Sequence, residues 1–165
     1  MARVASLQIS TRLEASGSGG ICRTILDSLP HWFGIPASVA DYVAIADRSP
    51  SVIANADGRD VGITTLVTHS PYAAEVYVMG VLHHYRRKGI GRAMLQAAEV
   101  HLASSGVELL QVKTLSPSKP DVGYEETRAF YLAYGFRPHE EFPLLWDSDN
   151  PALQMVKTIP NSTGP

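Results

Sequence analysis

The chain contains a single cysteine, Cys22, among its 165 residues. One cysteine cannot close an intramolecular disulfide, and no group of Cys and His residues has the spacing of a zinc site. The sequence therefore excludes a secreted disulfide scaffold. We expect a protein of a reducing compartment, cytoplasmic and without a metal ion.

Long hydrophobic runs are also missing, because polar residues interrupt every apolar stretch before the roughly 18 to 20 residues that a membrane span needs. Charge of one sign is not in excess either: 14 Lys and Arg stand against 16 Asp and Glu, a net charge of -2. Such a balance provides no general attraction for nucleic acid or acidic membranes. We expect neither as a partner.

The remaining composition, 45% hydrophobic and 18% charged residues, is that of a globular protein. The length favours one domain over residues 1–165. Apolar residues at helical spacing predict four helices, at about 21–29, 38–46, 90–102 and 124–134. Strand-like runs are predicted near 4–13, on both sides of Asp57-Gly58 within 51–68, at 73–82, at 107–115, from Phe136 onward and at 152–159.

Local signals refine these boundaries. Asp57-Gly58 is a strong hairpin signal, and Gly135 is a natural residue to end the last helix. Ser38 and Asp41 have the spacing of a capping box, and the residues FPLLWDSDNP (142–151) are expected to form a loop. The order of elements predicts a mixed α/β fold with about seven strands and about four helices on the two faces of the sheet.

The densest chemical signal is the segment Arg86-Arg87-Lys88-Gly89-Ile90-Gly91-Arg92, which follows a strand and opens a helix. Amides at a helix N-terminus attract phosphate, and glycines allow a ligand to approach the backbone closely. The segment lacks the Gly-Lys-Ser/Thr ending of a P-loop, and Met94 occupies the third glycine position of a dinucleotide fingerprint. By itself it is either a phosphate-binding loop or a solvated basic turn.

The wider pattern resembles the GNAT superfamily of acetyl-CoA-dependent N-acetyltransferases. Its signature is Arg/Gln-x-x-Gly-x-Gly/Ala between a strand and a helix, which residues 86–91 match, and a later aromatic-Tyr-x-x-x-Gly-Phe run is supplied by residues 130–136. The resemblance covers about residues 50–158, the expected cofactor-binding core, and leaves helices at about 20–48 on the substrate side. It implies mostly antiparallel strands and allows a homodimer.

The resemblance also implies a cofactor site for acetyl-CoA. A β-bulge in the central strand would free backbone groups for the pantetheine arm, and the basic loop would hold the pyrophosphate. The implied cofactor-binding residues are Met79, Val81, Leu82, Arg86, Arg87, Lys88, Gly89, Ile90, Gly91 and Arg92. The side chains of the strand residues are equally explained by core packing.

Acetyl transfer to an amine needs a group that accepts the ammonium proton and a group that protonates the leaving thiolate. Tyr131 occupies the position where many GNAT members place the general acid. It also lies on an apolar face of the predicted helix, so the alternative is a tyrosine that only packs in the core. Glu75 precedes the cofactor-binding strand as the catalytic glutamate does in histone-acetylating relatives. Alternatively, Glu75 is an exposed strand carboxylate or a salt-bridge partner, and a water chain acts as the base in its place.

The chain departs from the family pattern at two positions before Tyr131. Many relatives have Asn seven residues earlier and Ala four residues earlier, where this sequence has Tyr124 and Thr127. A hydroxyl of either residue is a candidate to replace the Asn contact with pantetheine, and Tyr124 equally fits a packing role at the helix start.

Three large aromatic residues, Trp32, Phe33 and Trp146, lie in predicted loops, where GNAT enzymes usually build acceptor sites. They either bind substrate or complete the core. We therefore expect an enzyme that moves an acetyl group from acetyl-CoA to a primary amine of a small molecule or peptide. The alternative is a catalytically inactive module that binds CoA as a sensor or regulator.

Overall fold

The computed structural model describes residues 6–160, so the first two residues of the strand predicted at 4–13 lie outside the described part. The elements are β1 (Ile9–Glu14), α1 (Gly19–Asp27), α2 (Pro36–Arg48), β2 (Ser51–Ala56), β3 (Arg59–Ser70), β4 (Ala73–Val81), a 3-10 turn (His83–Tyr85), α3 (Ile90–Ser104), β5 (Leu109–Leu115), α4 (Val122–Tyr134), β6 (Arg137–Asp147) and β7 (Asn150–Thr158). The strands form one sheet in the order β1-β2-β3-β4-β5-β7-β6. The predicted mixed α/β fold is confirmed.

The chain divides into two compact units, each built around part of the sheet. Among the described residues, the first unit comprises 6–65 together with Val78–Ala98, and the second comprises Leu66–Tyr77 together with 99–160. Strands β3 and β4 contribute residues to both units. No helix among residues 6–160 is long and apolar enough to span a membrane.

In the first unit, the Asp57-Gly58 hairpin forms as predicted. Both residues have positive φ, 49° and 87°, which two-residue turns of this kind require. The side-chain oxygen of Asn55 accepts the Gly58 amide at 2.9 Å. The hairpin is thus fixed by its own turn residues, with β2 and β3 on either side.

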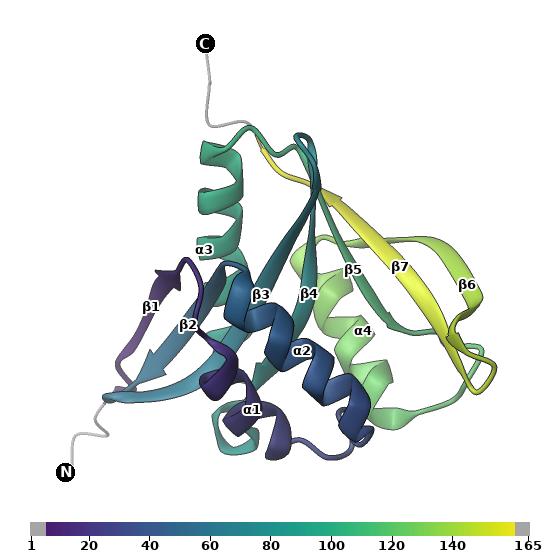
Figure 1. Cartoon of the computed structure of the whole chain (residues 1–165), viewed down its shortest axis with the longest axis horizontal. Helices are drawn as coiled ribbons and strands as arrows, with labels where there is room; N and C mark the ends of the chain where they lie inside the picture. The colour runs from purple at the N-terminus through teal and green to yellow at the C-terminus, as the bar shows by residue number, and fades with distance from the viewer. Residues whose placement is uncertain (1–5, 161–165) are drawn as a thin grey trace. The chain divides into compact units, whose positions relative to one another are not determined.

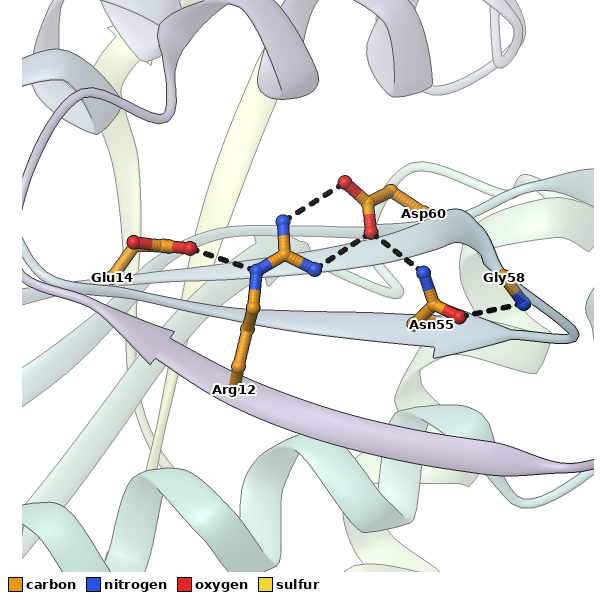
Figure 2. Close-up of polar contacts among 5 residues, drawn as sticks. All are labelled: Arg12, Glu14, Asn55, Gly58 and Asp60. Atoms are coloured by element: carbon orange, nitrogen blue, oxygen red, sulfur yellow. Dashed lines mark hydrogen bonds and ion pairs between the residues drawn. The ribbon is translucent and has the colours of Figure 1, made fainter.

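An ion pair joins β1 to this hairpin (Figure 2). Arg12 donates two parallel hydrogen bonds to the Asp60 carboxylate, at 2.7 and 2.9 Å, and a third to Glu14 at 2.7 Å. The Arg12 contact lowers the pKa of Asp60, and a further hydrogen bond from Asn55 acts in the same direction. β1 is antiparallel to β2 throughout its length.

The predicted capping box at Ser38 and Asp41 is wrong. Helix α2 begins earlier, at Pro36, with Ile35 as the N-cap residue and no side-chain cap. Proline suits the first turn of a helix because its fixed φ is already helical and its missing N–H is not needed there. Helices α1 and α2 pack against each other (Figure 1), and Cys22, Ile25 and Leu26 are buried on α1.

In the second unit, β5 runs parallel to β4 and antiparallel to β7. The loop predicted at 142–151 is wrong: β6 extends to Asp147, and only a short turn separates it from β7 (Figure 1). The Asp147 carboxylate closes that turn by accepting the Asp149 amide at 2.8 Å and the Asn150 side chain at 3.0 Å. β6 is an edge strand, where Pro138 and Pro143 interrupt less pairing than in a central strand.

Candidate active site

The end of β4 is held close to α1 in the first unit. A Cβ added at Gly80 would lie 3.1 Å from the Ile25 side chain and 3.2 Å from that of Leu29, so a larger residue would require these side chains to shift. Met79 and Val81, on either side, are half-buried. The strand segment predicted to meet pantetheine therefore has a fixed position against a helix.

Both backbone groups of Leu82 are used within the protein. Its amide donates to the Val61 carbonyl at 2.8 Å, and its carbonyl accepts the Tyr85 amide at 2.9 Å. The Leu82 side chain is 8% exposed. The contacts of Met79, Val81 and Leu82 with a pantetheine arm stay a prediction.

The basic loop has a backbone that few residue types adopt. Arg87 has φ 59° and Gly89 has φ 80°, two left-handed conformations separated by one residue. A Cβ added at Gly89 would meet nothing within 4 Å, so there is open space beside the chain. Glycine is favoured here because of its positive φ and not because of crowding. Left-handed residues close together in a loop can aim successive backbone amides toward a common anion.

Helix α3 starts directly after this loop. The Ala93 amide donates to the Gly89 carbonyl at 3.0 Å, and helix geometry leaves the preceding amides of Ile90 and Gly91 without an intrahelical acceptor. The Ile90 side chain is 1% exposed and anchors the helix start in the core. The amides and the positive end of the helix dipole thus coincide with the glycine-bearing loop.

Four cationic side chains surround this helix start. Arg86 is half-buried, with its Cζ 4.7 Å from the ring centroid of Trp32, and the Lys88 ammonium lies 5.7 Å from the centroid of Tyr85. Arg87 and Arg92 are exposed. The structure therefore gathers amides, a helix dipole and cations where the sequence predicted a pyrophosphate site.

The aromatic residues predicted to bind substrate have different settings. Trp32 and Phe33 lie in the segment between α1 and α2, as predicted, and Phe33 makes an edge-to-face contact with Tyr42 at 5.9 Å. Trp146 lies near the end of strand β6 rather than in a loop, and its side chain is 43% exposed. Their role in binding an acceptor stays a prediction.

Glu75 lies in the second unit, on β4, and is 4% exposed, so the alternative of an exposed carboxylate is wrong. Its Oε1 accepts from the Lys113 ammonium at 2.9 Å, and its Oε2 lies 2.5 Å from His69 Nε2. Gln111 also donates to Oε2 at 3.2 Å and is itself held by Gln154 at 2.8 Å.

Sequence reasoning missed these partners of Glu75. His69, Lys113 and Gln111 come from β3 and β5, and Glu75 is directly opposite Gln111 in the parallel register. One signal was available: Gln111 and Lys113 alternate with apolar residues, which places both side chains on one face of the strand.

Tyr131 lies on α4 in the second unit, and its side chain is 7% exposed. Its ring centroid is 5.5 Å from those of Phe130 and Phe136. The backbone carbonyl of Tyr131 accepts the amides of Gly135 and Phe136, and Gly135 has φ 123°, so the helix ends as predicted. The aromatic motif thus fixes both the tyrosine ring and the helix end.

The two departures from the family pattern are at the start of the same helix. The Asp121 side chain caps the helix by accepting the Tyr124 amide at 3.0 Å, which places Tyr124 in the first turn. The Thr127 hydroxyl donates to the Gly123 carbonyl at 3.1 Å. Its hydrogen is directed into the helix, so Thr127 offers a ligand an acceptor rather than a donor.

Comparison with known proteins agrees with this geometry. A family model for the acetyltransferase (GNAT) domain matches residues 47–138, more than half of the chain. An uncharacterized N-acetyltransferase of Chlorobaculum tepidum is 31% identical over 81 residues, which are 48% of this chain and 52% of that protein. The chain thus spans about half the length of this curated relative.

Two solved structures illustrate the likeness of the fold. A protein assigned to the GNAT family from Desulfovibrio desulfuricans has a TM-score of 0.79 at 17% identity, covering 93% of this chain and 100% of that one. An aminoglycoside 6′-N-acetyltransferase complexed with coenzyme A has a TM-score of 0.70 at 18% identity, covering 94% and 99%. The chain belongs to the GNAT acetyltransferase family.

Proposed function

We propose that this protein transfers an acetyl group from acetyl-CoA to a primary amine of a small molecule or peptide. The observation that carries the proposal is the loop at residues 86–91, where two left-handed residues, a helix start and several cations are combined. The chain belongs to the GNAT family, and the resemblance of this loop to the family signature favours the diphosphate of CoA as its ligand.

The binding roles follow from this proposal. The amides of Ile90 and Gly91 and the side chain of Arg86 would donate to the diphosphate, since anions are favoured at a helix N-terminus and guanidinium groups donate in pairs. Met79 and Val81 would contact the pantetheine arm. A related acetyltransferase has been solved with coenzyme A, which supports CoA as the cofactor class.

The chemical roles are assigned to two residues of the second unit. The Tyr131 hydroxyl would give its proton to the departing thiolate, an effect typically of about 10² to 10⁴ in rate. Glu75, or a water chain in its place, would take the proton from the ammonium form of the acceptor. Direct attack of the neutral amine on the thioester carbonyl would form the C–N bond, and the C–S bond would break as the thiolate takes the Tyr131 proton. The second proton lost by the nitrogen would return to the tyrosine, directly or through water.

The direct test measures thiol release from acetyl-CoA across a panel of amines, with mass spectrometry of the products. Thiol release with an acetylated product supports the proposal, and aminoglycosides belong in the panel because one structural relative is named for them. CoA binding without transfer to any amine would favour the sensor or regulatory module. Absence of CoA binding to the folded protein would overturn both.

A further inference from the structure

The cation–π contact between Trp32 and Arg86 joins two segments that are far apart in the sequence. Trp32 belongs to the segment between α1 and α2, whereas Arg86 belongs to the basic loop before α3. The Arg86 Cζ lies 4.7 Å from the centre of the indole ring, within the roughly 6 Å over which a cation is attracted to an aromatic face.

This contact restricts the orientation of the Arg86 side chain, whose Cζ lies over the indole ring. A guanidinium is planar, and its N–H groups donate within the plane, whereas an aromatic ring attracts its face. The indole beside the guanidinium therefore restricts the rotation of the Arg86 side chain before an anion binds. Less rotamer freedom is then lost when an anion binds.

Trp32 is itself firmly placed. Its amide donates to the carbonyl of Leu29 at 3.2 Å, and the Leu29 side chain is 5% exposed. The His31 ring meets the indole edge-to-face at 5.0 Å. Two residues after Trp32, a Cβ added at Gly34 would lie 2.9 Å from the Pro30 carbonyl oxygen. Any residue other than glycine would therefore require the backbone of this turn to shift.

We infer that Trp32 is a positioning residue for the cofactor: its indole face holds Arg86 in the orientation that binds the CoA diphosphate. The inference deepens the proposed function and rests on it. Trp32, which the sequence predicted to bind the acceptor, is thereby assigned a role in cofactor binding instead. Trp32 acts through Arg86, so its effect is confined to ligands that carry the diphosphate.

The test compares two acyl donors, acetyl-CoA and S-acetylpantetheine, which lacks the diphosphate. Trp32→Leu should weaken CoA affinity in calorimetry by about 2- to 30-fold, the range of a cation–π contact. It should lower kcat/KM for acetyl-CoA by a similar factor and leave kcat/KM for S-acetylpantetheine within about twofold. Trp32→Phe, which keeps an aromatic face, should recover most of the lost CoA affinity.

A double-mutant cycle with Arg86→Gln supplies the second readout. The effect of Trp32→Leu on CoA affinity should largely vanish when Arg86 is already replaced, because the two residues act through one contact. Tyr72→Leu is the matched control, since it removes an exposed aromatic side chain from the turn between β3 and β4. It should leave CoA affinity unchanged.

Fluorescence provides a signal that does not depend on replacing Trp32. The chain has only two tryptophans, so Trp146→Phe leaves Trp32 as the sole indole. Its emission should change saturably on titration with CoA, and this change should be lost when Arg86→Gln is added.

The outcomes separate the inference from the proposed function. If wild-type protein binds CoA but Trp32→Leu binds it equally well, or loses the same factor with both donors, the positioning role is overturned and the proposed function stands. If folded wild-type protein binds no CoA, both are overturned. Loss confined to acetyl-CoA, with partial recovery in Trp32→Phe, supports the inference.

Discussion

Lys113 and Glu75 form an ion pair between neighbouring strands, with the ammonium nitrogen 2.9 Å from Oε1 of the carboxylate. The Glu75 side chain is 5% exposed and that of Lys113 is 23% exposed. Removing one partner of such a pair leaves the other poorly compensated. This pairing makes a structural and a catalytic role of Glu75 separable by experiment.

Glu75→Gln should flatten the acidic limb of the pH–rate profile if the carboxylate is the base. The substitution should also lower the free energy of unfolding by about 1–3 kcal/mol, because Lys113 loses its charged acceptor. Lys113→Met is the matched variant, since it breaks the same pair and keeps the carboxylate. An unchanged pH profile in Glu75→Gln, with similar loss of stability in both variants, would assign Glu75 a structural role.

Tyr131→Phe should leave the fold intact and reduce kcat by about 10² to 10⁴, the usual effect of a general acid. The ring keeps its contacts with Phe130 and Phe136, so the melting temperature should change little. Tyr134→Phe removes a hydroxyl from the same helix, one that donates to Glu99 at 2.8 Å, and should retain turnover. Near-normal kcat in Tyr131→Phe would remove Tyr131 from the mechanism.

Arg86→Ala should weaken CoA binding by about 1.5–3 kcal/mol, the loss expected for a hydrogen bond to a charged group. Isothermal titration calorimetry with CoA measures this directly, and thermal unfolding checks that the protein is folded. Arg59→Ala, which removes an exposed arginine at the start of β3, should bind CoA as the wild type does. Equal affinity in Arg86→Ala and wild type would contradict the diphosphate contact.

Cys22 should resist alkylation in the folded protein. Its side chain is fully buried, and burial raises the pKa of the thiol to about 11. Only the thiolate reacts rapidly, so iodoacetamide at pH 8 should label the native protein slowly and the urea-unfolded protein quickly. Mass spectrometry follows both reactions, and rapid labelling of the native protein would show that α1 opens readily.

Arg12→Gln should reduce stability in a pH-dependent way. Because Arg12 lowers the pKa of Asp60 in the folded state, this stabilisation is complete above the unfolded pKa of about 3.9 and is lost as the pH falls through the folded value. The variant should lose up to about 1 kcal/mol at pH 7 and less at pH 2, measured by urea unfolding. Arg59→Gln is the control, and an equal loss at both pH values in Arg12→Gln would refute the linkage.

Local chemistry explains which parts of the fold could be predicted from the sequence. The Asp57-Gly58 turn and the helix end at Gly135 depend on backbone angles that neighbouring residues specify, and both were predicted correctly. The start of α2 was not, because Pro36 and Ser38 both offer plausible helix starts and the earlier residue prevails. The end of β6 was missed because prolines in the sequence do not reveal that the strand lies at a sheet edge.

The same distinction applies to the candidate site. The basic loop is contiguous, so its position before a helix could be predicted from residues 86–92 alone. The partners of Glu75 come from separate strands, and His69 and Lys113 meet it only when the sheet register is known. The Trp32–Arg86 contact likewise depends on tertiary structure. Linear spacing contains no information on such pairs.

The two prolines of β6 have a consequence for self-association. An edge strand presents backbone donors and acceptors to which a strand of another molecule can add, and this is a common route to fibrils. Pro138 and Pro143 have no backbone N–H to offer an added strand, and a proline in an edge strand typically places its nitrogen on the solvent side, which interrupts the template. Concentrated protein should therefore form few thioflavin-positive aggregates, and replacing both prolines with threonine should increase them.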